Sequence, residues 1–203
     1  MYDNILSKEQ KQLLPFILSF KKEYYMVGGT AVSLQIGHRE SIDFDLFKFS
    51  NVQPTKIVER LKKFGWQYQL IFKNSESFHI IVNDVKVTFF QYPFKITTSK
   101  AFEGLKMPDL LHLAAMKAYA LGRRAKWKDY VDLYFILKDF YSLEDVSAKS
   151  KQIFEGLFSP KLFNQQLCFF NDINYSEEVT YCIDPVPDET IKAFLTDLAT
   201  NKI

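Results

Sequence analysis

The sequence contains few of the residues that cross-link small proteins or bind zinc in them. It has two cysteines, Cys168 and Cys182, which are too few for a disulfide framework, so we expect a reducing, cytoplasmic environment. Three dispersed histidines complete no zinc-ligand spacing with these cysteines. A Gly-x-Ser-x-Gly motif is also missing, so the sequence gives no indication of a serine hydrolase.

Long apolar runs and a large excess of charge are missing as well. No run reaches the roughly 20 residues that span a bilayer, and the first residues lack the apolar segment of a signal peptide, so we expect no membrane association. The net charge of +2 is too small to indicate nucleic-acid binding by itself. With 203 residues, 47% hydrophobic and 25% charged, the composition is typical of a globular protein with a real core.

Hydrophobic periodicity predicts an α+β fold, with a mixed sheet followed by a helical C-terminal region. We expect a first domain at 1–104, an α+β core, and a second at 105–203 that completes the active site. The expected helices of the first half are 8–22, whose boundary is uncertain because of Pro15, then 30–36 and 54–64; the expected strands are 24–27, 41–47, 66–72, 78–82 and 85–90. Asn83-Asp84 is the expected turn between the last two strands, and a closing helix is expected from Glu189.

One stretch combines a glycine pair with a predicted helix start. Gly28 and Gly29 follow the strand, and glycine allows both positive φ and close approach of the backbone to a ligand. A helix that begins at this point directs free N–H groups into the turn, where phosphate binds well, and Thr30 adds a hydroxyl. A plain tight turn is the alternative interpretation.

Two acids then interrupt an apolar run. Asp43 and Asp45 are separated by Phe44, and residues i and i+2 of a strand lie on the same face, about 7 Å apart. Their carboxylates can therefore converge on a hard cation such as Mg²⁺ or Mn²⁺, which shares oxygen ligands with phosphates. The alternative is that both acids lie on a solvent-facing side of the strand, with Ile42, Phe44 and Leu46 on the other side.

The glycine pair and the two acids, separated by residues 30–42, resemble the pattern of the polymerase-beta-like nucleotidyltransferase superfamily. Arg39 and Ser41 strengthen this resemblance, because an Arg-x-Ser/Thr ahead of the acids is common in that superfamily. The resemblance implies that an NTP binds at the glycine turn and that the acids hold the metal.

Two predicted helices carry charges in apolar surroundings. Between Asp109 and Arg123, Lys117 is the only charged residue, and a buried ammonium requires a carboxylate or a phosphate as partner. Arg124 follows two turns later, on the same face of the helix.

The next helix repeats this feature with the opposite sign. Asp132 lies among apolar residues, and Asp129 lies three residues earlier on the same face. An interhelical ion pair with Lys117 is one interpretation. The other is that Lys117 faces the site and stabilises phosphate charge. Both hold together if an acid orients the lysine.

The segment from Leu113 to Leu137 resembles the C-terminal motifs of the AbiEii/AbiGii toxin family, nucleotidyltransferase-like proteins of abortive-infection and type IV toxin–antitoxin systems. The resemblance rests on Lys117, Arg124, Lys128, Asp129, Asp132, Leu133 and Tyr134. It implies a toxin that transfers an NMP to RNA, including tRNA, and that pairs with a cognate antitoxin. A small-molecule acceptor, such as an aminoglycoside, and a catalytically degenerate nucleotide-binding module are the alternatives.

One position departs from the superfamily pattern. A third acid is expected on a later strand, where this chain has Thr88. Members of the toxin family resemble this chain at that position. We therefore expect Asp129 or Asp132 either to supply a carboxylate as base or to hold Lys117. The nearby "GRRAKWKD" indicates a surface for a nucleic-acid backbone with a base stacked on Trp127, or simply a solvated connection.

Overall fold

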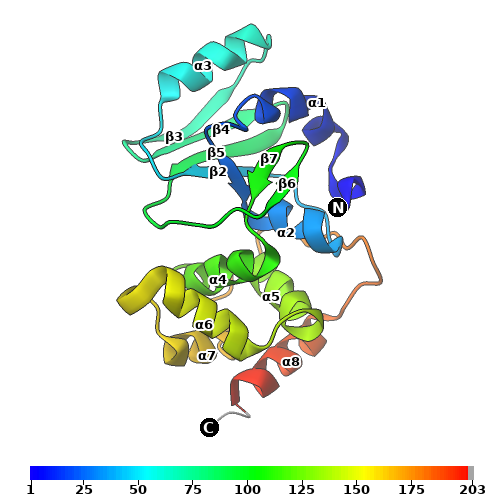
Figure 1. The fold of residues 1–203 in the computed structure, drawn as a ribbon. Coiled ribbons are helices and arrows are strands. Elements are labelled where there is room, and N and C mark those ends of the chain that lie inside the picture. The colour runs from blue at the N-terminus through cyan, green and yellow to red at the C-terminus, as the bar shows by residue number, and fades with distance from the viewer. Residues whose placement is uncertain (201–203) are drawn as a thin grey trace. The chain divides into compact units, whose positions relative to one another are not determined.

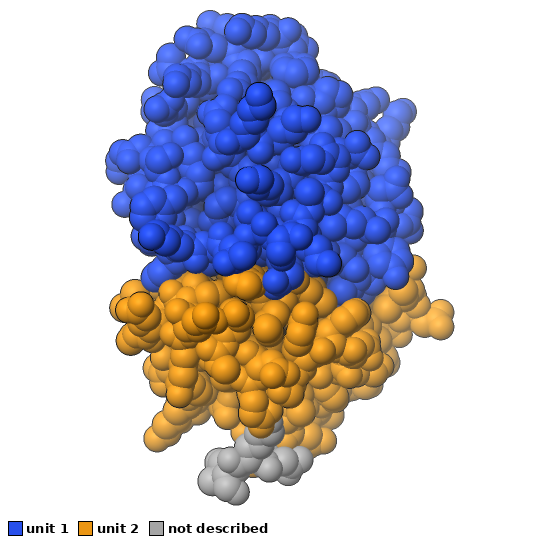
Figure 2. All heavy atoms as spheres, in the orientation of Figure 1, with its two compact units in different colours: residues 1–109 blue, residues 110–203 orange. Residues whose placement is uncertain are grey.

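The computed structural model describes residues 1–200. These residues divide into two compact units, 1–109 and 110–200 (Figure 2). Each unit is described by itself. The division lies a few residues after the predicted boundary at 104/105, which falls at the start of a short strand. Within residues 1–200, no helix combines the length and the apolar character needed to cross a membrane.

The first unit is a mixed sheet with helices (Figure 1). Its elements are η1 (Asp3–Ile5), α1 (Lys8–Leu18), β1 (Tyr25–Val27), α2 (Gly28–Ile36), β2 (Phe44–Lys48), α3 (Pro54–Lys63), β3 (Gln69–Lys73), β4 (Ser77–Val82), β5 (Val85–Gln91), β6 (Lys100–Phe102) and β7 (Leu105–Met107). The five-stranded sheet has the order β1-β2-β5-β4-β3. Only the β2–β5 pair is parallel, and the other three pairs are antiparallel.

One face of this sheet forms the core of the unit. Phe44, Leu46 and Phe89 are fully buried on that face, and the ring of Phe20, just after α1, lies 4.9 Å from the ring of Phe89. Figure 1 shows α1 and α3 on the same side of the sheet, and the ring of Phe64 lies 6.0 Å from that of Phe16. The α+β prediction is therefore confirmed.

Helix α1 continues through Pro15, although proline removes a backbone donor from the helix. Ser7 and Gln10 form a capping box at its start, and Leu13, Phe16 and Ile17 are fully buried. Burying each of these side chains contributes about 1.5–3 kcal/mol, which offsets the cost of the proline.

The second unit is helical. Its elements are α4 (Leu110–Leu121), α5 (Trp127–Asp139), α6 (Leu143–Phe154), η2 (Glu155–Leu157), α7 (Pro160–Leu167) and α8 (Asp188–Thr200). Helices α5 and α6 pack on α4, and α8 contacts both α5 and α7. Between α7 and α8 a long irregular segment crosses the start of α5, where Asn174 forms an isolated parallel bridge with Lys126.

Candidate active site

The two acids of the first unit lie on the face of the sheet opposite its core. Asp45 is the second residue of β2 and Asp43 lies just before the strand, and both side chains are half-buried. Phe44 and Leu46 point to the core face and are fully buried. The strand begins at Phe44 and not at the predicted Ser41, and Ile42 is 54% exposed, so the apolar side described in the alternative interpretation does not include Ile42.

The glycine turn lies directly against one of these acids. Gly28 has a φ of +73°, and a β-carbon at this position would lie 2.0 Å from Oδ2 of Asp45. Helix α2 begins at Gly28, earlier than the predicted start at Thr30, and its N-cap residue is the apolar Val27, whose side chain forms no capping hydrogen bond. The first backbone N–H groups of α2 therefore lie beside a carboxylate and have no side-chain cap at the N-cap position.

The second glycine contacts the residues that precede the acids. A β-carbon at Gly29 would lie 2.8 Å from Nη2 of Arg39 and 2.9 Å from Oγ of Ser41. Arg39 is 2% exposed, and its Nη1 donates a hydrogen bond of 2.8 Å to the carbonyl oxygen of Glu40. Arg39 and Ser41 thus pack under the turn and fix the loop between α2 and β2.

Thr30 holds the same loop from α2. Its buried hydroxyl donates to the carbonyl oxygen of Asp43 and lies at hydrogen-bond distance, 3.0 Å, from Oγ of Ser41. Gln10 of α1 donates to that carbonyl as well, at 3.5 Å. In this structure the Thr30 hydroxyl therefore positions the residues next to Asp43, whereas the sequence suggested direct contact with phosphate.

The sheet register gives Asp45 two polar neighbours across the strands. Asp45 pairs with Thr88 on β5, and Thr88 pairs with His79 on β4, so the three side chains share one face of the sheet. Thr88 therefore lies beside Asp45, where the superfamily resemblance places a third acid. His79 was not among the predicted site residues. Burial lowers the pKa of its imidazole, Lys86 lowers it further, and Asp45 acts in the opposite direction.

The sequence contains enough information to pair His79 with Thr88. The expected two-residue turn at Asn83-Asp84 is present, with positive φ at both residues, and it makes Val82 the partner of Val85. Counting back along that hairpin pairs His79 with Thr88. The missing information was that β5 lies beside β2, a parallel pairing between strands distant in sequence.

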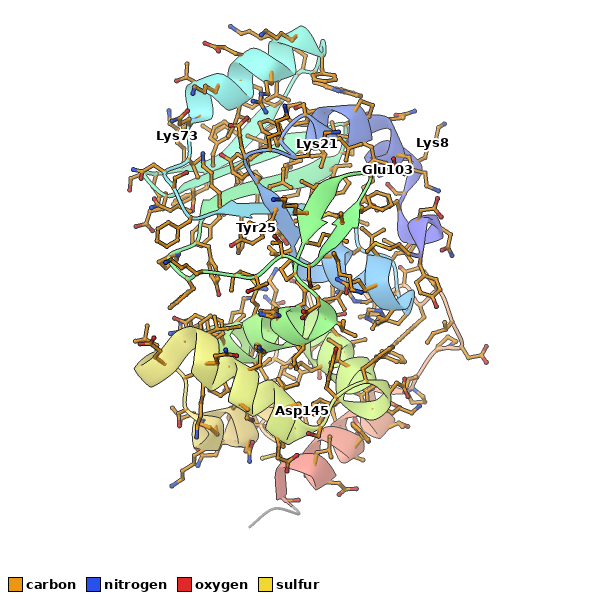
Figure 3. All side chains as sticks on the ribbon, viewed as in Figure 1. Lys8, Lys21, Tyr25, Lys73, Glu103 and Asp145 are labelled. Carbon is orange, nitrogen blue, oxygen red and sulfur yellow. The ribbon has the colours of Figure 1, made fainter. Side chains whose placement is uncertain are left out.

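Tyr25 provides a further polar group on β1 (Figure 3). It pairs with Phe47, so its side chain lies on the same sheet face as Asp45. The hydroxyl is buried without a hydrogen-bond partner among residues 1–200, and burial raises the pKa of the phenol. A buried polar group of this kind is uncommon, and it marks a candidate contact for a ligand.

The acids of the first unit are suited to share a metal ion with a ligand. In the part of the chain that the structure describes, no three His, Cys, Asp or Glu side chains form a group that could hold a metal ion. A Mg²⁺ ion held by Asp43 and Asp45 would complete its coordination with phosphate oxygens and water, which is how this ion commonly binds in phosphoryl-transfer sites.

The second unit contains a buried charge cluster. Nζ of Lys117 on α4 lies 2.7 Å from Oδ1 of Asp129 and 2.6 Å from Oδ2 of Asp132, both on α5. All three side chains are buried, with Asp132 fully so. The interhelical ion pair expected from sequence is present, and it involves both acids. In this structure the acids therefore orient Lys117.

Arg124 joins this cluster from outside the helix. Helix α4 ends at Leu121, so Arg124 does not continue its face as expected, but Nε still lies 3.2 Å from Oδ2 of Asp129. The guanidinium side chain is 54% exposed. Burial favours a raised pKa for Asp129, but Lys117 and Arg124 outweigh that effect, so the pKa of this carboxyl lies below its usual value.

The expectation that a base stacks on Trp127 is wrong. Trp127 is 4% exposed, and its ring lies 5.4 Å from that of Tyr175 and 6.0 Å from that of Tyr130. The indole therefore belongs to the core of the second unit. Arg123 and Arg124 beside it are exposed, and Lys126 and Lys128 are half-buried.

Comparison with known proteins supports the assignment of the fold. No protein-family model matches the sequence. An uncharacterized protein of Aquifex aeolicus is 27% identical over 93% of this chain and 94% of its own length. Among solved structures, MenT4, a nucleotidyltransferase toxin from Mycobacterium tuberculosis, is similar with a TM-score of 0.62 at 14% identity, over 94% of this chain and 80% of that one.

A second solved structure, a Helicobacter pylori protein provisionally named a nucleotidyltransferase, is similar over 96% of this chain and 95% of its own. The TM-score is 0.57 and the identity 17%. Both similarities extend over nearly the whole chain and so include the helical second unit. The chain therefore has the α+β fold of nucleotidyltransferases.

Proposed function

We propose that this protein is a nucleotidyltransferase that moves an NMP from an NTP to an acceptor hydroxyl. The observation that carries the proposal is the contact between Gly28 and Asp45. It places the free amides at the start of α2, which suit phosphate, next to a carboxylate, which suits a divalent ion. An ordinary strand turn does not require this combination.

In the proposed reaction, the backbone of Gly28 and Gly29 holds the β- and γ-phosphates of the NTP. Asp43 and Asp45 hold Mg²⁺, or Mn²⁺, which supplies charge neutralisation and alignment for phosphoryl transfer when bound. The acceptor oxygen attacks the α-phosphorus, and the bond from this phosphorus to the oxygen shared with the β-phosphate breaks. Pyrophosphate leaves, and the proton of the acceptor hydroxyl passes to water. Thr30, Arg39 and Ser41 keep the loop that carries Asp43 in place.

Lys117 and Arg124 are proposed to neutralise the negative charge of the triphosphate. The ammonium of Lys117 is held by two acids, so its position is fixed before the ligand binds, and such preorganisation strengthens electrostatic stabilisation. Asp129 and Asp132 act in this proposal as positioning residues.

We propose RNA, including tRNA, as the acceptor and growth arrest as the outcome, with a cognate antitoxin as partner in the cytoplasm. The similarity to MenT4, which is named a nucleotidyltransferase toxin, and the resemblance to the AbiEii/AbiGii family support this part of the proposal. Thr88 beside Asp45 does not exclude transfer, because two carboxylates and the phosphates can hold the metal.

The test is to incubate the protein with each NTP labelled at the α-phosphate, Mg²⁺ and total RNA. We expect label on RNA for the wild type and for the control D84N, which removes an exposed acid at the β4–β5 turn. D43N and D45N should abolish the label. Label on a small hydroxyl compound instead would identify a small-molecule acceptor. Nucleotide binding without any transfer, unchanged by D45N, would overturn the proposal and leave a non-catalytic binding module.

A further inference from the structure

Four basic residues cluster between α4 and the first turn of α5. This basic cluster consists of Arg123, Arg124, Lys126 and Lys128. Arg123 lies flat on the ring of Tyr119, 3.5 Å from its centroid, and is exposed. Arg124 is the partly exposed partner of Asp129, and the side chain of Lys126 is 32% exposed. The side chain of Lys128 is 15% exposed, so the cluster lies at the surface with Lys128 as its most buried member.

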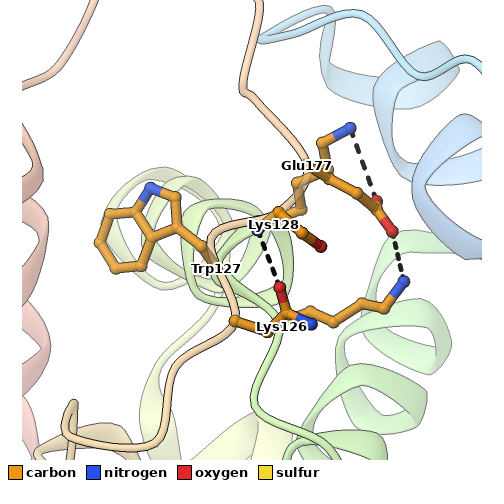
Figure 4. A pocket seen from close by; sticks show the side chains of 6 residues that line it. Lys126, Trp127, Lys128 and Glu177 are labelled. Atoms are coloured by element: carbon orange, nitrogen blue, oxygen red, sulfur yellow. Dashed lines mark hydrogen bonds and ion pairs between the residues drawn. The ribbon is translucent and has the colours of Figure 1, made fainter.

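One acid from a distant segment lies between the two lysines. The carboxylate of Glu177 pairs with the ammonium of Lys126, and its second oxygen lies 3.6 Å from Nζ of Lys128 (Figure 4). Figure 4 shows both ammonium groups reaching Glu177, while the indole of Trp127 points the other way. Glu177 itself is 39% exposed, so the pair is open to solvent and to competing anions.

The segment that carries Glu177 is anchored by other contacts. The backbone N–H of Trp127 donates to the carbonyl oxygen of Asn174 at 3.2 Å. The backbone N–H of Asn174 donates to the carbonyl oxygen of Ala125 at 2.7 Å. Tyr175 packs on Trp127. The segment thus has anchoring contacts other than those of Glu177, and this carboxylate offsets positive charge of Lys126 and Lys128.

We propose that Arg123, Lys126 and Lys128 of the basic cluster bind the phosphate backbone of RNA and that Glu177 occupies Lys126 and Lys128 until the phosphates displace it. Solvent-exposed ion pairs are weak, so a backbone phosphate can replace the carboxylate at little cost. Because the indole of Trp127 is buried and the side chains of the cluster are cationic, we expect contacts to the RNA backbone and not to the base sequence. This inference rests on the proposed function only in the choice of RNA.

The experiment measures binding of a fluorescent RNA by anisotropy, without NTP or divalent metal, across a range of salt concentrations. The variants are E177Q, the double variant K126Q/K128Q, and E178Q, which makes the same change of charge at the exposed next residue. We expect E177Q to tighten binding several-fold and clearly more than E178Q. K126Q/K128Q should weaken binding and reduce the slope of log affinity against log salt by about 1.4, or ~0.7 for each lost contact.

The proposal fails if E177Q binds RNA no more tightly than E178Q, or if K126Q/K128Q binds as the wild type does. Thermal melting of each variant identifies any loss of folding, and a variant whose Tm falls is replaced by K126R/K128R, which should retain binding. Failure of NMP transfer leaves this result unchanged, because neither nucleotide nor metal is in the binding assay. The two proposals can therefore fail separately.

Discussion

Oδ2 of Asp45 occupies the space that a β-carbon of residue 28 would need, because that carbon would lie only 2.0 Å from it. The glycine turn and the strand acid therefore lie so close together that a side chain at residue 28 would displace the carboxylate. This relationship joins the two motifs that the sequence presents separately, and it leads to the first prediction.

G28A should remove nucleotide binding and destabilise the first unit. The substitution strains a backbone with φ of +73° and forces the Asp45 carboxylate to move. G65A is the matched control, because Gly65 has the same φ of +73° and nothing within 4 Å of its added carbon. Urea unfolding should give a loss of about 1 kcal/mol for G65A from the backbone alone and a larger one for G28A. Equal losses and retained nucleotide binding in both variants would refute the contact.

T88D should create a response to divalent metal. Thr88 pairs with Asp45, so an added carboxylate there repels Asp45 in the absence of metal and lowers Tm. Mg²⁺ or Mn²⁺ should then raise the Tm of T88D by more than it raises that of the wild type, since binding to the folded state stabilises it. T88V keeps the shape and adds no charge, and should show no added response. A T88D variant indifferent to metal would argue against a metal site at Asp45.

K117M should unfold more easily than the wild type, by about 3–5 kcal/mol, because it leaves Asp129 and Asp132 buried without the ammonium. K138M, at an exposed lysine of α5, is the control and should change stability by less than about 0.5 kcal/mol. Adding D129N and D132N to K117M should recover part of the loss, because the buried charges are removed. If K117M is as stable as K138M, the cluster does not organise this unit.

Lowering the pH should reduce the free energy of unfolding of the wild type more than that of D129N. The folded-state pKa of Asp129 is below its ordinary value, since Lys117 and Arg124 outweigh burial. The unfolded chain therefore binds a proton more readily, and the contribution of Asp129 is complete above about pH 4 and lost as the pH falls through the folded pKa. Unfolding free energies measured from neutral pH down to about pH 3 should fall less steeply for D129N than for D84N, which controls for the change in charge. Parallel curves would contradict this account of the ion pair.

Much of the first unit followed from the sequence, and the exceptions have identifiable causes. Asn83-Asp84 fixed the β4–β5 hairpin because both residues tolerate positive φ. The hairpin of β6 and β7 was missed because its strands have three residues each and its turn, Glu103-Gly104, lies in a stretch without alternation. Strand β2 was placed too early because Ile42 continues the apolar pattern, yet lies exposed.

In the candidate site, features set by nearby residues were predictable from the sequence, and features set by distant residues were not. The need of Lys117 for a carboxylate followed from its apolar helix, and helical spacing named Asp129 and Asp132 as its partners. The hydroxyl of Thr30 could not be assigned, because its partners at Ser41 and Asp43 depend on how the loop folds back. Trp127 was misassigned because its ring partner Tyr175 comes from the distant segment that crosses α5.

The most direct test of the central proposal is a crystal structure with Mn²⁺ and a non-hydrolysable NTP, read by the anomalous signal of manganese. We expect a manganese peak at the carboxylates of Asp43 and Asp45, with the triphosphate against the amides of Gly28 and Gly29. A bound nucleotide whose phosphates and metal lie away from both aspartates would contradict the proposed site.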